Sequence, residues 1–238
     1  SLSRYKDPIE GRIGILTSSG GHGVLAVDAC SAHGMQIPRL SEKTQQAFKA
    51  RLSPSIRDIA ALGNPIIQTP NLDRLVKRGV SFNRAYMQGG MGGATCVPSR
   101  AMLLSGQPLF RVDEGLLRDE TWPAAFAKAG YTTFLSGKWH NGANSISKSF
   151  QIAKSVFVGG MTDPLKAKLS DVTGGVLGKP TVSEKHACET FADEAISFIN
   201  GQKDSPFLCY VPFDAPHDPH IVPNSFKTAY NPNSIPLP

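Results

Sequence analysis

The sequence predicts an α/β protein built in layers around a largely parallel sheet. Two stretches support this fold class, because in each a helix-forming segment is followed by a β-prone run. Residues 121–130 begin with Thr-Trp-Pro and end at a glycine, and the β-prone run 131–136 follows them. Residues 190–199 have apolar side chains at i, i+4 and i+7, and the apolar run 207–211 comes next. Alternation of helices and strands is typical of folds in which parallel strands are joined by helices.

Composition narrows the possible functions. With 238 residues, 40% of them hydrophobic and 8% aromatic, the chain can bury a substantial core in one or two domains. The net charge of +6 suits an anionic ligand, but the basic residues form no run that would indicate nucleic-acid binding. No stretch reaches the roughly 20 apolar residues of a membrane-spanning helix. The chain opens with Ser-Leu-Ser-Arg, without an initiator methionine or a signal peptide, so we interpret it as a processed chain or a fragment.

The amino-terminal part has weaker signals. Residues 18–23, Ser-Ser-Gly-Gly-His-Gly, form either an ordinary turn or a phosphate-binding loop, although the Lys-Ser/Thr pair of a P-loop is missing. The polar stretch 41–51 is expected to be an exposed helix or unstructured. Further on, Asn71 is expected to cap a helix that ends at Gly79, and residues 80–82 to form a short strand.

A glycine-rich run leads to a cysteine at the start of a helix-forming segment, Cys96-Val-Pro-Ser-Arg-Ala-Met-Leu-Leu-Ser-Gly106. Pro98 is tolerated in a first helical turn, so Cys96 is expected at or beside the N-cap. Free backbone N–H groups and the helix dipole favour negative charge there, either a thiolate or an anionic substrate, and Arg100 adds a cation one turn on. The alternative is a structural cysteine packed at a turn. Four cysteines in all show neither metal-ligand spacing nor a disulfide framework: Cys30, Cys96, Cys188 and Cys209.

Two groups of polar residues follow the predicted strands. Gly137-Lys138-Trp139-His140 comes after the first strand, and a group that contains His217 comes after the second. The carboxyl edge of a parallel sheet is where α/β proteins bind ligands. Strand alternation predicts that Lys138 and His140 lie on one side and Trp139 on the other. From these residues alone, a solvated lysine and a structural histidine are equally compatible with the pattern.

The remaining segments are expected to support the site. Residues 144–185 are rich in Gly, Ser and Lys, with weak strand signals at 155–158, and we expect an insertion or loop region that helps shape substrate access. Residues 224–238 are expected to be loop-like. Four other polar residues are expected to be structural, supporting or solvent-facing: His186, Cys188, Asp214 and His220.

The pattern Cys-x-Pro-Ser-Arg, with a glycine six residues after the arginine, resembles the signature of the sulfatases, in which the cysteine is oxidised to formylglycine (3-oxoalanine). Further blocks that resemble this family in order and rough spacing lie at 69–75, 79–86, 137–140 and 215–219. The resemblance implies an alkaline-phosphatase-like three-layer αβα sandwich. It divides the chain into residues 1–55, which have no match, and residues 56–238, the amino-terminal part of a catalytic domain.

The resemblance also implies roles for five residues. Cys96, as formylglycine, would be the nucleophile and a metal ligand. Arg100 and Lys138 would surround the sulfate with positive charge, and Lys138 and His217 would bind the substrate. His217 would protonate the leaving alcohol oxygen, while His140 would steer the second hydroxyl of the hydrated aldehyde. These roles match the needs of a negatively charged ester: cations, a strong oxygen nucleophile and a proton donor.

The metal site is the point where the family pattern is incomplete. Sulfatases hold Ca²⁺ with an Asp-Asp pair near the start of the domain, and the resemblance therefore implies Ca²⁺. In this chain residues 52–57, Leu-Ser-Pro-Ser-Ile-Arg, precede Asp58 without such a pair, so the acidic ligands are not identified.

Taken together, the resemblance implies a sulfatase that acts on aryl or carbohydrate sulfate esters. It further implies a formylglycine-generating enzyme as a partner and a periplasmic or extracellular location. Two alternatives stay open: a phosphonate or phosphodiester hydrolase of the same superfamily, and a truncated, catalytically inactive homologue.

Overall fold

The structure is a computed structural model that describes residues 59–64, 66–80, 89–90, 95–202 and 205–231. The chain divides into two compact units, residues 1–87 with 228–238, and residues 88–227. The glycine-rich turn at 18–23, the polar stretch at 41–51 and the domain boundary at 55–56 lie outside the described residues, as do residues 81–82 of the expected strand. These expectations therefore stay predictions.

The first unit contains a short 3-10 helix, η3 (Ala60–Leu62), and helix α3 (Pro70–Arg78). Thr69 links them, because its hydroxyl accepts a hydrogen bond from Ala60 N at 2.9 Å and donates one to Asp73 Oδ1 at 2.9 Å. The prediction that Asn71 caps this helix is wrong. The helix already begins at Pro70, whose fixed φ suits a first turn, and Asn71 lies inside that turn.

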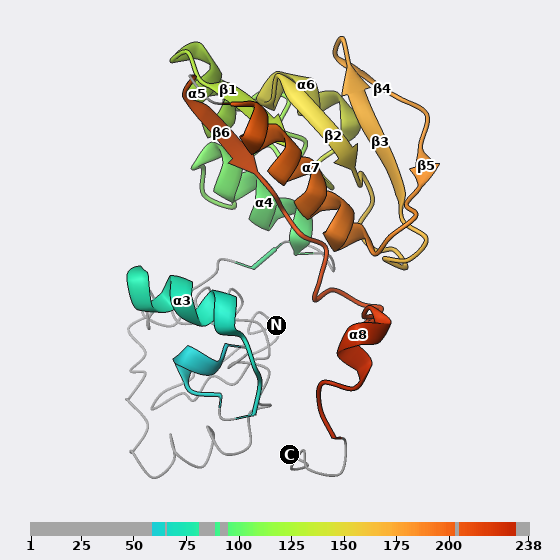
Figure 1. The fold of residues 1–238 in the computed structure, drawn as a ribbon. Helices are drawn as coiled ribbons and strands as arrows, with labels where there is room; N and C mark the ends of the chain where they lie inside the picture. Colours follow the sequence, from blue (N-terminus) through green and yellow to red (C-terminus); the bar gives the residue numbers. More distant parts are fainter. Residues whose placement is uncertain (1–58, 65, 81–88, 91–94, 203–204, 232–238) are drawn as a thin grey trace, which may run out of the picture. The chain divides into compact units, whose positions relative to one another are not determined.

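The second unit is built on a six-stranded sheet (Figure 1). The strands follow the order β4-β3-β2-β1-β6, with β5 beside β3. Their bounds are β1 Thr132–Leu135, β2 Ile152–Val156, β3 Lys168–Thr173, β4 Val176–Leu177, β5 Thr181–Val182 and β6 Phe207–Tyr210. Strand β1 pairs in parallel with β2 and β6, which confirms the predicted parallel arrangement for β1 and β6, whereas β2 lies in the stretch expected to be a loop region.

The other half of the sheet is antiparallel and comes from residues that we expected to form a loop region. Strand β3 pairs antiparallel with β2, β4 and β5, so the loop interpretation of residues 144–185 is wrong. The polar sequence of β3, Lys-Leu-Ser-Asp-Val-Thr, conceals the strand because several of its side chains remain partly exposed. Gly174 and Gly175, with φ of 58° and 80°, form the tight turn into β4.

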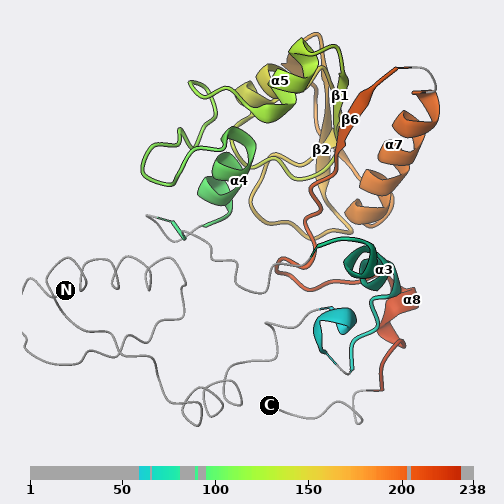
Figure 2. The same cartoon turned by 90° about the vertical axis from the view of Figure 1, so that its left-hand side faces the viewer.

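Helices cover both faces of this sheet, as Figure 2 shows. On one side lie α4 (Cys96–Ser105), α5 (Trp122–Lys128) and α6 (Ile146–Ser149), which follows the 3-10 helix η4 (Ala143–Ser145), and on the other lies α7 (Ala187–Gly201). A first core cluster joins Leu104 of α4 to Leu135 and Val156 of the sheet. A second cluster joins Phe191 of α7 to Leu169 of β3. The predicted three-layer α/β sandwich is thereby confirmed.

Two smaller observations complete the fold. Residues 224–227 form a short helix, α8 (Asn224–Lys227), so the expectation of a wholly loop-like tail is wrong at this point. In the described part of the chain, no helix has the length and apolar character needed to cross a membrane.

Candidate active site

Cys96 is the first residue of α4, as the sequence predicts. Ala101 and Leu104 on one face of this helix are buried in the core, which directs Cys96 and Arg100 outward. These two side chains line a cavity of about 510 Å³. The other lining residues come from α4, from the last residue of β6 and from the segments after β1 and β6: Ser99, Leu103, Lys138, Tyr210, Pro212, Phe213, Asp214, Ala215, Pro216 and His217. The cavity therefore lies where the first turn of α4 meets the carboxyl ends of two parallel strands.

His217 faces the cysteine across this cavity. Its Nε2 atom lies 4.0 Å from Cys96 Sγ, and its Nδ1 atom lies 2.9 Å from the carbonyl oxygen of Asp218. A carbonyl oxygen only accepts hydrogen bonds, so Nδ1 carries the hydrogen. In the neutral ring, Nε2 is then an acceptor directed at Cys96.

Arg100 connects α4 to the segment that follows β1. Its Nη1 donates a hydrogen bond to the carbonyl oxygen of Lys138 at 2.8 Å. Asn141, which is 2% exposed, strengthens the same connection from the other side by donating from Nδ2 to Val97 O at 2.9 Å and to Glu114 O at 2.8 Å. The bond from Arg100 and the bond from Asn141 to Val97 hold the segment after β1 against α4, while the bond to Glu114 joins it to the loop after that helix.

Lys138 is the most deeply buried charge of the site. Its Nζ lies 3.1 Å from Asp214 Oδ1, and the two side chains are 2% and 5% exposed. The ammonium group also donates to the carbonyl oxygen of Gly160. The backbone is paired as well, because Lys138 N donates to Pro212 O at 2.8 Å. The segments after β1 and β6 are thus joined by one backbone hydrogen bond and one buried ion pair.

This ion pair leads to a stability prediction. Replacing Lys138 by methionine leaves the Asp214 carboxylate buried without its cation, and we expect the free energy of unfolding to fall by about 3 kcal/mol. Chemical denaturation monitored by circular dichroism measures the loss. The double variant Lys138→Met/Asp214→Leu removes both charges and should recover most of it. If the double variant were as unstable as the single one, the loss would come from packing and not from the unpaired carboxylate.

His140 lies beside the cavity but does not line it. The regular pairing of β1 ends at Leu135, and His140 takes a positive φ of 67°. The side chains of Lys138 and His140 both lie at Gly160, whereas Trp139 packs into the core. The pKa of His140 is lowered by burial and then by the positive charges of Lys138 and Arg100, which keeps the ring neutral near pH 7. A Cβ atom at Gly160 would lie 2.7 Å from His140 Nε2, so the glycine leaves the space that the ring occupies.

The structure therefore brings Cys96, Arg100, Lys138 and His217 to one cavity, with His140 adjacent. Sequence reasoning missed two residues that position them, Asn141 and Gly160, and it left open whether Asp214 supports the site or faces solvent. For Asp214 a signal was available, since a carboxylate directly after a buried strand falls at the ligand-binding edge of the sheet. For Asn141 and Gly160 no local pattern indicated the contacts.

The other polar residues considered from the sequence lie elsewhere. Cys188 and Cys209 do not line this cavity, and burial raises the pKa of both thiols. His186 is buried at the N-cap of α7, where its Nδ1 accepts a hydrogen bond from Cys188 N at 3.3 Å. His220 is exposed and lies 3.3 Å from the carboxylate of Asp218.

A calcium ion has no set of protein ligands among the described residues. No group of three or more His, Cys, Asp or Glu side chains gathers there in an arrangement that could hold a metal ion. A hard cation such as Ca²⁺ requires six to eight oxygen ligands, so the described residues do not fit the implied metal.

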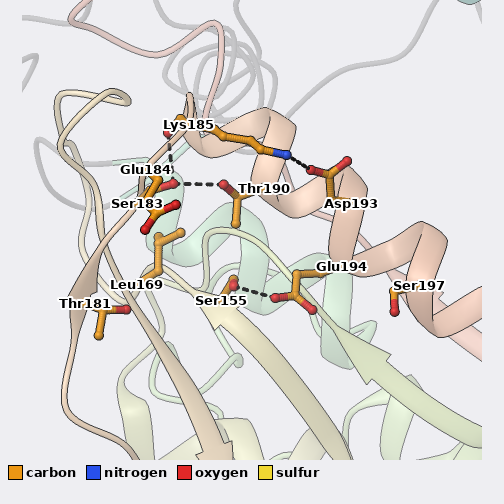
Figure 3. A pocket seen from close by; sticks show the side chains of 10 residues that line it. All are labelled: Ser155, Leu169, Thr181, Ser183, Glu184, Lys185, Thr190, Asp193, Glu194 and Ser197. Carbon is orange, nitrogen blue, oxygen red and sulfur yellow. Dashed lines mark hydrogen bonds and ion pairs between the residues drawn. The ribbon is translucent and has the colours of Figure 1, made fainter.

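A second cavity, of about 420 Å³, lies between α7 and the strands β2, β3 and β5 (Figure 3). Hydroxyl and carboxylate groups dominate its lining. Its lysine, Lys185, is paired with Asp193 at 2.6 Å, and Glu194 accepts a hydrogen bond from Ser155 Oγ at 3.0 Å. Because three of its lining residues are acidic and the lysine is already paired, this cavity suits a sulfate ester less well than the cavity at Cys96.

Comparison with known proteins supports the same conclusion. The family model described as Sulfatase matches residues 41–235. The N-acetylglucosamine-6-O-sulfatase of Bacteroides thetaiotaomicron is 29% identical over 168 residues, which cover 67% of this chain and 28% of that protein. The ulvan-active sulfatase of Formosa agariphila is 29% identical over 192 residues, covering 73% and 35%. The chain thus spans about a third of the length of these curated relatives.

Solved structures also resemble this chain. One protein, solved in complex with its substrate D-glucosamine-2-N,6-O-disulfate, is 27% identical with a TM-score of 0.55, and the match covers 68% of this chain and 32% of that one. Ps i-CgsB, solved in complex with k-i-k-neocarrahexaose, shares the fold with a TM-score of 0.60 at 20% identity, over 75% of this chain and 46% of that one. With the family model matching most of the sequence, and with the signature cysteine at the start of α4, this chain belongs to the sulfatase family.

Proposed function

We propose that this chain carries the nucleophile and substrate-contact part of a sulfatase that hydrolyses carbohydrate sulfate esters. The observation that carries the proposal is the position of Cys96, at the start of α4, in a cavity that it shares with two cations and with His217 at 4.0 Å. The relatives named above act on sulfated sugars by their names, which favours a carbohydrate substrate over an aryl sulfate.

Cys96 suits conversion to formylglycine, because it is partly exposed at the end of a helix and faces the cavity. When present, the hydrated aldehyde supplies an oxygen nucleophile and a second hydroxyl that lets sulfate leave by restoring the aldehyde. A formylglycine-generating enzyme is the partner that this modification requires.

The chain's own residues perform the remaining tasks. Toward the described residues, Arg100 uses one of its five N–H donors, for the bond to Lys138 O, and the others can hold sulfate oxygens in the cavity. His217, held through Nδ1, presents Nε2 at the position of the reacting group, where its protonated form donates to the leaving alcohol oxygen. Neutral His140, beside the cavity, is placed to hold a hydroxyl without adding charge. We derive no step from Ca²⁺, since the described residues do not fit it.

A location in the periplasm or outside the cell remains part of the proposal. So does the alternative of a phosphonate or phosphodiester hydrolase, because the cavity's cations would also attract such esters.

One experiment separates these possibilities. The chain is co-expressed with a formylglycine-generating enzyme, and the tryptic peptide 85–100 is analysed by mass spectrometry for conversion of Cys96. Hydrolysis of N-acetylglucosamine 6-sulfate, an aryl sulfate and an aryl phosphodiester is then measured on the same sample. Conversion with the highest kcat/KM on the sugar sulfate supports the proposal. Faster phosphodiester hydrolysis favours the second function, and conversion without any hydrolysis favours an inactive homologue.

A further inference from the structure

The cavity at Cys96 contains a buried negative charge that sulfate binding does not require. Asp214 lines the cavity and is 5% exposed at its side chain, with Oδ1 at 3.1 Å from Lys138 Nζ. In a site that attracts anions, a carboxylate lowers the affinity for every anionic ligand. Its position next to a cavity cation therefore calls for a functional explanation.

The charges that face the cavity are few. Among the described lining residues, Arg100 and Lys138 are cations, Asp214 is an anion, and His217 is the one further titratable group besides the Cys96 thiol and the Tyr210 phenol. His140, adjacent to them, is neutral near pH 7 because burial and the nearby cations lower its pKa. Asp214 thus offsets one of the two cations. Apart from the histidines, the charged side chains of the cavity therefore sum to one positive charge.

We propose that Asp214 is a specificity-determining residue, which makes the cavity select esters with one negative charge over esters of the same shape with two. This inference rests on the proposed function. A sulfate monoester carries a single charge at all ordinary pH values, whereas a phosphate monoester carries about −1.5 to −2 at pH 7 with a second pKa of about 6. Both present a tetrahedral group of similar size, so charge is the property that separates them.

The burial of the pair makes this selection effective. A charge held away from water interacts with a ligand through a lower effective dielectric constant and is screened little by salt. A singly charged ester neutralises the excess positive charge of the cavity. A doubly charged ester leaves an uncompensated negative charge beside the Asp214 carboxylate, and repulsion weakens its binding.

The test compares phenyl sulfate with phenyl phosphate by isothermal titration calorimetry on the unmodified chain, at pH 5 and at pH 7.5. The phosphate ester gains its second charge between these values, while the sulfate ester does not change. Dividing the Kd for phosphate by the Kd for sulfate at each pH cancels most of the contribution from protonation changes in the cavity itself. We expect this ratio to rise at least about tenfold from pH 5 to pH 7.5.

The variant Asp214→Asn keeps the shape of the side chain and removes its charge, so the rise in the ratio should shrink to less than about threefold. Asp218→Asn is the matched control, since it removes a carboxylate of the same loop that is 74% exposed, and it should keep the full rise. If Asp214→Asn does not fold, a ratio on the parent chain that does not change with pH still contradicts the proposal.

Three results would overturn the inference. A ratio that does not change with pH in the parent chain contradicts charge selection, and an unchanged rise in Asp214→Asn assigns the selection to other residues. Both of these leave the proposed function intact, because phenyl sulfate still binds. Absence of saturable phenyl sulfate binding would overturn the inference alone, because the proposed function concerns sugar sulfates, which the hydrolysis assay tests separately.

Discussion

Replacing Cys96 by alanine is expected to lower kcat/KM for sulfate esters by a factor of about 10⁵ or more in the formylglycine-modified protein. Alanine cannot be converted to an aldehyde, so the cavity would retain Arg100, Lys138 and His217 without a nucleophile. Binding of the ester should persist, because the cations remain. The measurement is steady-state hydrolysis of a sugar sulfate by protein co-expressed with a formylglycine-generating enzyme, together with the Kd of the same ester.

Cys209→Ala is the matched control for this prediction. Cys209 lies in β6 outside the cavity lining, and burial raises the pKa of its thiol, so its removal should leave kcat/KM close to that of the parent protein. Substantial turnover in Cys96→Ala would place the nucleophile elsewhere. Equal losses in both variants would indicate that the fold, and not the chemistry, depends on these side chains.

Replacing Gly137 by alanine is expected to reduce the free energy of unfolding by at least about 4 kcal/mol. A Cβ atom at this position would lie 2.4 Å from the carbonyl oxygen of Pro212, and the residue has a φ of 135°. The same Pro212 oxygen accepts the hydrogen bond from Lys138 N, so moving it separates the two segments that form the site. Urea denaturation gives the change in free energy, and loss of the Arg100 and Lys138 positions should also weaken binding of phenyl sulfate.

The variant Gly142→Ala separates the steric clash of the added Cβ atom from the cost of a positive φ. Gly142 has a φ of 84°, but a Cβ atom there would meet no heavy atom within 4 Å. Only the cost of a positive φ remains, about 1–2 kcal/mol. If the two alanine variants lost the same free energy, backbone conformation alone would explain the effect at Gly137.

Much of the second unit could be predicted from the sequence, because its signals are local. An early proline and a terminal glycine located α5, and apolar periodicity located α7, while short β-prone or apolar runs located β1 and β6. Pro98 in a first turn placed Cys96 at the start of α4. Each of these features depends on interactions within about one or two helical turns, or on the alternation of a single strand.

Local sequence signals did not predict the antiparallel half of the sheet. Strand β3 is polar and partly exposed, and its pairing with β2 depends on residues that are far apart in the sequence, such as Ala153 and Val172. The intrinsic β-propensity of these residues predicts a strand only weakly, because strand formation also depends on the partner strand and on which face is buried.

By itself, then, the sequence determined the layered α/β class, the parallel strands β1 and β6, and four of the residues that reach the cavity: Cys96, Arg100, Lys138 and His217. Only the tertiary structure decided which charges lie beside these residues and which contacts position them. The examples are the ion pair of Lys138 with Asp214 and the space that Gly160 leaves for His140. The physical reason is that charge compensation and steric fit in a buried site depend on atoms from separate segments. A contact between residues 76 positions apart produces no periodic pattern in the sequence of either segment.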